Sequence, residues 1–183
     1  MTTQPTLQTE RLLLRPFTLV DAAEVQRMAG DYDVASVTGN IPHPYEDGMA
    51  EAWINTQQPN YEAGTQATFA ITSRSEGILI GAIGLIVNLQ HQRAEMGYWV
   101  GKEHWNKGYC TEAASVVVRF GFEQLNLRRI EATHLARNPA SGRVMQKIGM
   151  RQEGYFRQHI FKWGVFEDLV IYGLLPSDLL QNE

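Results

Sequence analysis

Apolar residues recur along this chain with two different periods. Between Thr65 and Ser73 they alternate with polar residues, which is the pattern of a half-buried strand. From Ile78 to Val87 they form a nearly continuous run, as in a strand buried on both faces. Further strands are predicted for Glu10–Pro16, Arg93–Gly101, Arg128–Ala136, Gln152–Phe161 and Val165–Leu174, the last two joined as a hairpin.

Helical periodicity fills the intervals between these strands. Thr18 and Asp21 are spaced as a capping pair that opens a helix through Ala29. A short helix that begins after Asn138 ends at Gly149, a favourable C-cap residue. Two more helices are predicted, from Tyr45 to about Gln58 and from about Thr111 to Leu125. Strands that alternate with helices indicate an α/β (α+β) fold, here with antiparallel pieces at both ends.

The composition is that of an ordinary soluble domain. The chain has 183 residues, and we expect a single domain over residues 1–183. A net charge of −4 argues against a nucleic-acid-binding protein, which normally presents a basic face. A single cysteine excludes an internal disulfide. No apolar run reaches the roughly 18 residues that span a bilayer, so we expect a cytoplasmic protein that binds no membrane.

A polar loop precedes the helix predicted from Thr111. The amides of a helix N-terminus are unpaired and the helix dipole is positive there, which together favour an anion. Gly108 allows a ligand to approach the backbone closely, and Lys107 adds a positive charge. The segment therefore predicts a phosphate site. The alternative is a plain connection in which Gly108 serves a tight turn.

Two further segments give the loop a context. The loop reads Trp105-x-x-Gly108-x-Cys110, and Asn138 and Ser141 form an Asn-x-x-Ser that Lys147 and Gly149 follow. With "TERLLLRPF" and "AEMGYWVGKEHWNKGYCTEA", these motifs make the chain resemble the GNAT superfamily of N-acetyltransferases. The superfamily loop is Gln/Arg-x-x-Gly-x-Gly/Ala and binds the coenzyme A pyrophosphate. The likeness is strongest to the branch that acetylates the N-terminal alanine or serine of ribosomal proteins, and it extends from Thr9 to Leu174.

The resemblance implies both a fold and a co-substrate. The fold is a mixed, mostly antiparallel sheet of six to seven strands with a V-shaped splay and about four flanking helices. The co-substrate is acetyl-CoA, its pantetheine arm lying in the splay, and no metal is implied. The residues expected to bind it are Trp99, Val100, Gly101, Asn106, Lys107, Gly108, Tyr109, Cys110, Thr111, Asn138, Ser141 and Lys147.

The resemblance also assigns an acid and a base. Glu95 matches the strand glutamate that serves as base, and the alternatives are a strand-edge carboxylate paired with Arg93 or a charge on the acceptor side. Many members carry an acidic tyrosine where this chain has Met145, which cannot donate a proton. Ser141 therefore inherits the role of acid, although it also suits a hydroxyl that bonds backbone amides near a helix start. Tyr98 and Tyr172 are the remaining candidate donors.

The resemblance leaves more than one function open for the acceptor side. An N-terminal α-amine of a protein, possibly ribosomal, attacking directly in a ternary complex is the first hypothesis. A small amine such as a polyamine or an aminoglycoside, and a non-catalytic module that binds coenzyme A, are the alternatives. The protein is expected to be a monomer or a homodimer. The resemblance places the acceptor pocket between the first two helices, the loop near "GNIPHPYE" and the final hairpin. Aromatic residues and one histidine are expected to line it: His43, Tyr45, Trp53, Tyr155, Phe156, Phe161 and Trp163.

Cys110 is expected to be present because it is small. A cysteine at a helix N-terminus tends toward a low pKa, which would suit a covalent acyl-enzyme. The superfamily has glycine or alanine at this position, and no histidine lies next to Cys110 in the sequence to act as its base. Direct attack by an amine requires no such intermediate. We therefore expect a packing role for this side chain.

Overall fold

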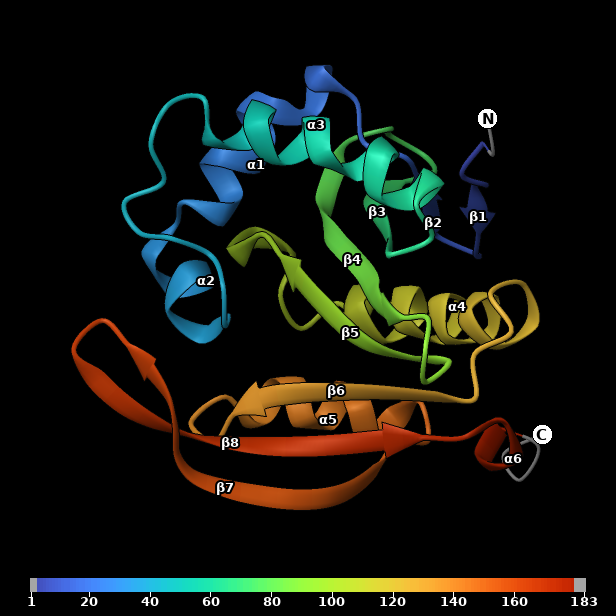
Figure 1. The fold of residues 1–183 in the computed structure, drawn as a ribbon. Helices are drawn as coiled ribbons and strands as arrows, with labels where there is room; N and C mark the ends of the chain where they lie inside the picture. The colour runs from blue at the N-terminus through green and yellow to red at the C-terminus, as the bar shows by residue number, and fades with distance from the viewer. Residues whose placement is uncertain (1–2, 180–183) are drawn as a thin grey trace.

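A computed structural model describes residues 3–179, and the other six residues of the predicted domain lie outside it. In the described chain one sheet holds eight strands in the order β1-β2-β3-β4-β5-β6-β8-β7 (Figure 1). The strands are β1 (Leu7–Gln8), β2 (Leu12–Arg15), β3 (Gln66–Ser73), β4 (Leu79–Asn88), β5 (Arg93–Val100), β6 (Arg129–Leu135), β7 (Arg151–Lys162) and β8 (Val165–Leu174).

Six α-helices and two 3-10 helices accompany the sheet in the described residues. The α-helices are α1 (Ala22–Ala29), α2 (Tyr32–Val37), α3 (Met49–Glu62), α4 (Tyr109–Glu123), α5 (Pro139–Lys147) and α6 (Pro176–Leu179). The 3-10 helices are η1 (Leu19–Asp21) and η2 (Lys102–His104). The predicted mixed α/β class is confirmed, and β1, α2 and α6 raise the number of elements above the prediction.

Side-chain alternation places helices on both faces of the sheet. Phe69 and Ile71 of β3 pack in the core beneath α4 and α5, whereas Ala70 between them packs against α1 and α3. The run predicted to be buried on both faces is buried from Leu79 to Ile83, and Ile86 is exposed near its end. The central strands therefore hold two separate cores, one on each side.

The sheet is open between β5 and β6. These two strands run parallel and pair only where Arg93, Ala94 and Glu95 meet residues 129–131. Beyond Glu95 they diverge, with β4 remaining beside β5 and β8 beside β6 (Figure 1). This divergence is the predicted V-shaped splay, and it leaves one backbone edge of β5 without a neighbouring strand.

The β7–β8 hairpin reaches from the C-terminal half of the sheet to α2. Its turn is Trp163–Gly164, with φ of 49° and 84°, as a two-residue hairpin of the favoured twist requires. The Trp163 ring lies 5.5 Å from the rings of both Tyr32 and His43. These contacts fix the hairpin tip beside the segment that joins α2 to α3 (Figure 1).

Candidate active site

A pocket of about 980 Å³ lies where β5 and β6 diverge. One wall is β5 with the loop that leads into α4, and another is the start of α5. Apolar residues of α1, α2 and α3, with Ile160 and Leu169 of the hairpin, line another side, and parts of β3, β4, β6 and the segment that follows α2 complete the lining. The pocket therefore joins the predicted coenzyme A loop to the predicted acceptor region.

Most of the residues predicted to form the site meet in this pocket. Gly101 and Lys107 are not among its described lining residues: the Gly101 amide donates to the Ile80 carbonyl, and the Lys107 carbonyl accepts from Arg11. Of the residues expected around the acceptor, Tyr45 and Trp53 reach the pocket. Those of the predicted catalytic and cofactor-binding set that line it are Glu95, Trp99, Val100, Asn106, Gly108, Tyr109, Cys110, Thr111, Asn138, Ser141 and Lys147.

The loop before α4 has a defined and unusual backbone. Gly108 is the N-cap of α4 with φ of 80°, and Asn106 has φ of 60°. The Trp105 indole N–H donates to the Val100 carbonyl at 3.0 Å and ties the loop to β5. The first amides of α4 thus face a pocket from a rigid turn, in an arrangement that fits a pyrophosphate.

A second set of contacts fixes the start of α4 to the N-terminal strands. The Glu112 carboxylate accepts from the Thr9 hydroxyl at 2.6 Å and from the Arg11 amide at 2.9 Å. Arg11 also donates from Nε to Glu112 at 2.7 Å and from Nη1 to the Lys107 carbonyl at 3.0 Å. Burial raises the pKa of Glu112, but these donors outweigh it and bring the pKa below its ordinary value. Glu112 is therefore held as a carboxylate, and the loop is clamped on both sides of Gly108.

Glu95 lies at the point where the sheet opens. Its side chain is exposed to the pocket, and Oε1 accepts from the Thr133 hydroxyl of β6 at 3.2 Å. The suggested pairing with Arg93 is not present, since Arg93 forms its salt bridge with Glu131. Among the described residues no cation pairs with Glu95, and its second oxygen has no described hydrogen-bond donor.

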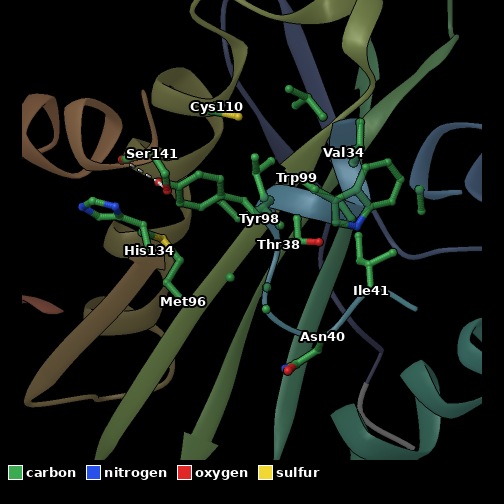
Figure 2. Close-up of a pocket in the computed structure, with 18 of the residues that line it drawn as sticks. Val34, Thr38, Asn40, Ile41, Met96, Tyr98, Trp99, Cys110, His134 and Ser141 are labelled. Atoms are coloured by element: carbon green, nitrogen blue, oxygen red, sulfur yellow. Dashed lines mark hydrogen bonds between the residues drawn. The ribbon is translucent and has the colours of Figure 1, made fainter. Parts of the chain in front are cut away.

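Asn138 and Ser141 form the start of α5. Asn138 is the N-cap of the helix that was predicted to begin after it, and its Oδ1 accepts from the Ser141 amide at 3.4 Å. The Ser141 Oγ lies 2.9 Å from the Tyr98 hydroxyl, which also lies 3.0 Å from the Ser141 carbonyl (Figure 2). Met145 is fully buried in the core. Tyr172 is not a described lining residue, and its hydroxyl accepts from Gln146.

Cys110 packs between the pocket and the core. Burial raises the pKa of its thiol to about 12, so the sulfur is neutral at physiological pH. This direction is opposite to that of an activated nucleophile. The expected packing role agrees with this environment.

Two groups of pocket residues lie outside the predicted catalytic and cofactor-binding set. The first is the segment Thr38–Pro42, which belongs to the loop that the family resemblance places beside the acceptor. The second comprises Thr133 and His134 of β6. Alternation along β6 places Thr133 on the same face as Glu131, which pairs in register with Glu95. The alternation is visible in the sequence, whereas the pairing of β5 with β6 is not. Within the described chain, no cluster of three or more His, Cys, Asp and Glu side chains is arranged to hold a metal. None of the described helices is long and apolar enough to cross a membrane.

Comparison with known proteins gives consistent results. The family model described as "Acetyltransferase (GNAT) domain" matches residues 11–151. An uncharacterized N-acetyltransferase of Bacillus subtilis, YoaA, is 34% identical over 93% of this chain and 97% of its own. A solved GNAT-family acetyltransferase from Bacillus anthracis is 32% identical, with a TM-score of 0.83 over 94% of this chain and 99% of that chain.

Two more distant proteins differ in the acceptor that their names state. The [ribosomal protein uS5]-alanine N-acetyltransferase of Escherichia coli is 24% identical over 74% of this chain and 71% of its own. The spermidine N-acetyltransferase of Vibrio cholerae, solved with CoA and spermine, is 22% identical. Its TM-score is 0.81 over 94% of this chain and 99% of that chain. The latter likeness shows a shared fold.

Proposed function

This chain belongs to the GNAT family of acetyltransferases, and we propose that its acceptor is the N-terminal α-amine of a protein or peptide. As a member of that family it is an acetyl-CoA-dependent N-acetyltransferase. The choice of acceptor is supported by the charge inside the pocket. Glu95 is the one carboxylate among the described residues that line it, and the acceptor side is otherwise apolar or neutral. Such a pocket suits an acceptor with one amine and an uncharged flank.

The donor end of the pocket fits coenzyme A. The amides after Gly108 and the helix dipole suit the pyrophosphate, and the unpaired edge of β5 around Trp99 suits the pantetheine arm as an added strand would. Asn138 presents an amide on the opposite wall, and Lys147 lies exposed on α5 near the same opening. Acetyl-CoA supplies an activated thioester carbonyl. The chain supplies its orientation.

Two side chains are proposed to move protons. Glu95 accepts a proton from the amine, directly or through a water molecule, and Ser141 gives one to the departing sulfur. An α-amine has an unperturbed pKa of about 7.7–8.0, against about 10.4 for lysine, so it loses its proton readily to one carboxylate. Direct attack in a ternary complex requires no covalent enzyme intermediate, which agrees with the neutral Cys110 thiol.

A polyamine or an aminoglycoside is the second candidate, favoured by the fold shared with the spermidine enzyme. Such acceptors carry several cations, and burying each one requires an opposite charge. A ribosomal protein N-terminus is the preferred macromolecular acceptor, by analogy with the uS5-alanine enzyme. We also propose a cytoplasmic location, which the single cysteine suits, and a monomeric or homodimeric protein.

The acceptor is tested by mass spectrometry of candidate amines incubated with the protein and acetyl-CoA. The panel holds peptides that begin with alanine or serine, spermidine and an aminoglycoside. The matched control is each peptide with a blocked N-terminus and an internal lysine. We expect acetylation of free α-amines alone. Preferential acetylation of spermidine, or of the lysine in blocked peptides, would replace the proposed acceptor.

A further inference from the structure

A hydrogen bond joins the two sides of the open sheet. Tyr98 comes from β5, and Ser141 comes from the first turn of α5 on the far side of the splay. Figure 2 shows the Tyr98 ring directed at Ser141, while the neighbouring Trp99 points to the opposite side, toward Val34 and Ile41. A tyrosine and a serine 43 residues apart in the chain therefore share one contact inside the pocket.

The contact contains fewer protons than oxygen acceptors. Tyr98 has one O–H and lies 3.0 Å from the Ser141 carbonyl and 2.9 Å from Oγ. If its proton goes to the carbonyl, the Ser141 O–H donates to the phenol oxygen. If its proton goes to Oγ instead, the Ser141 proton becomes free to point into the pocket. Rotation of two hydroxyls exchanges the two states without breaking the contact.

The surroundings keep Tyr98 in its protonated form. Burial is the largest effect and raises the pKa of Tyr98 far above its ordinary value, against the opposing hydrogen bond from Ser141. The phenol is thus a permanent donor throughout the range in which an α-amine reacts. Met145, at the position where many relatives carry a tyrosine, is buried and offers no proton.

We propose that Tyr98 is a positioning residue for the proton donor Ser141. Its hydroxyl holds the Ser141 Oγ at the pocket wall and donates a hydrogen bond to that oxygen as the serine proton leaves. The inference rests on the proposed role of Ser141 as acid. In the step, the amine nitrogen forms a bond to the acetyl carbon, and the carbon–sulfur bond breaks with its electron pair on sulfur. The Ser141 proton passes to sulfur, and Oγ regains a proton from pocket water. The amine proton leaves through Glu95 to solvent. Tyr98 keeps its own proton.

The experiment is a double-mutant cycle of Tyr98→Phe and Ser141→Ala, measured with any amine that the wild type acetylates. Because any accepted amine can be used, the result does not depend on whether the natural acceptor is an α-amine. Tyr98→Phe removes the hydroxyl alone, and we expect kcat to fall about ten-fold with an unchanged Kd for coenzyme A. Ser141→Ala is expected to lower kcat roughly 100-fold. In that background Tyr98→Phe should cause no further loss.

Tyr172→Phe is the matched control, because Tyr172 is also buried and also bonds a residue of α5. It should retain wild-type kcat, whereas a general effect of losing a buried phenol would appear in both variants. Equal fold losses from Tyr98→Phe in the wild-type and Ser141→Ala backgrounds would overturn the proposal. So would a Tyr98→Phe variant that loses coenzyme A affinity and retains kcat, or a Ser141→Ala enzyme with full activity.

Discussion

Replacement of Gly108 by valine isolates the role of the loop backbone. At φ of 80° an L-residue is strained by about 1–2 kcal/mol, and an added Cβ meets the Arg11 guanidinium at 3.4 Å and no closer atom. Backbone strain is therefore the main cost, and the melting temperature should fall by about 2–8 °C for a chain of this size. Relief of the strain turns the first amides of α4. Losing one hydrogen bond to a charged phosphate weakens binding by about 1.5–3 kcal/mol, or roughly ten- to hundred-fold in Kd.

Gly77→Val supplies the control for this prediction. Gly77 also has a positive φ, of 71°, with open space around it, and it lies outside the pocket in the turn before β4. Both variants should be destabilised alike, whereas calorimetric titration with coenzyme A should show an affinity loss for Gly108→Val alone. The reasoning is refuted if Gly108→Val binds coenzyme A within two-fold of Gly77→Val.

Three shorter predictions address single side chains. Cys110→Ala should keep most activity, and coenzyme A should slow alkylation of Cys110; an acetyl group trapped on the sulfur, seen by mass spectrometry, would contradict both. Glu95→Gln should lower kcat by about 100-fold or less at neutral pH and spare coenzyme A affinity, since an α-amine needs little help; a wild-type pH–rate profile would reject its role as base. Burial raises the pKa of Asp21, but hydrogen bonds from Arg15 and Thr18 outweigh it and lower the pKa overall. This stabilisation is present above the unfolded-state pKa of about 3.9 and is lost as pH falls through the folded pKa. Asp21→Asn should thus cost about 2 kcal/mol in urea unfolding at pH 7 and progressively less as the pH falls below about 3.9, and a cost that does not change with pH would exclude the ion pair as the cause.

The longer elements were predictable because each carries several turns or pleats of one pattern. The unpredicted α2 has six residues, of which only Val34 and Ala35 are buried, too few to establish a helical period. The predicted start of the second helix, at Tyr45, was wrong: α3 begins at Met49, because Gly48 takes φ of 84° as its N-cap. Strand β1 has two residues and no period at all.

The site was predictable where its residues are near one another in the chain, and less so where they meet across it. The loop around Gly108 and the helix that begins after Asn138 were identified from short motifs. Arg11 and Glu112 both occur in the motifs that carry the family resemblance, yet no periodicity pairs residues 101 positions apart. Gly101 and Lys107 lie within the predicted segments but turn toward other parts of the chain, which only the folded backbone determines.

The open seam of the sheet also has a mechanical meaning. Beyond Glu95 no described strand pairing joins the N-terminal and C-terminal half-sheets, so their angle depends on helix packing and on contacts across the gap. Acetyl-CoA that hydrogen-bonds the free edge of β5 and contacts the start of α5 would fix the angle between the two half-sheets. The part of the pocket proposed for the acceptor is lined by Trp99 from one half-sheet and by Leu169 from the other, so its width would be fixed once acetyl-CoA is bound. We therefore expect acetyl-CoA to bind before the acceptor, an order of addition that follows from the open sheet and requires no moving lid.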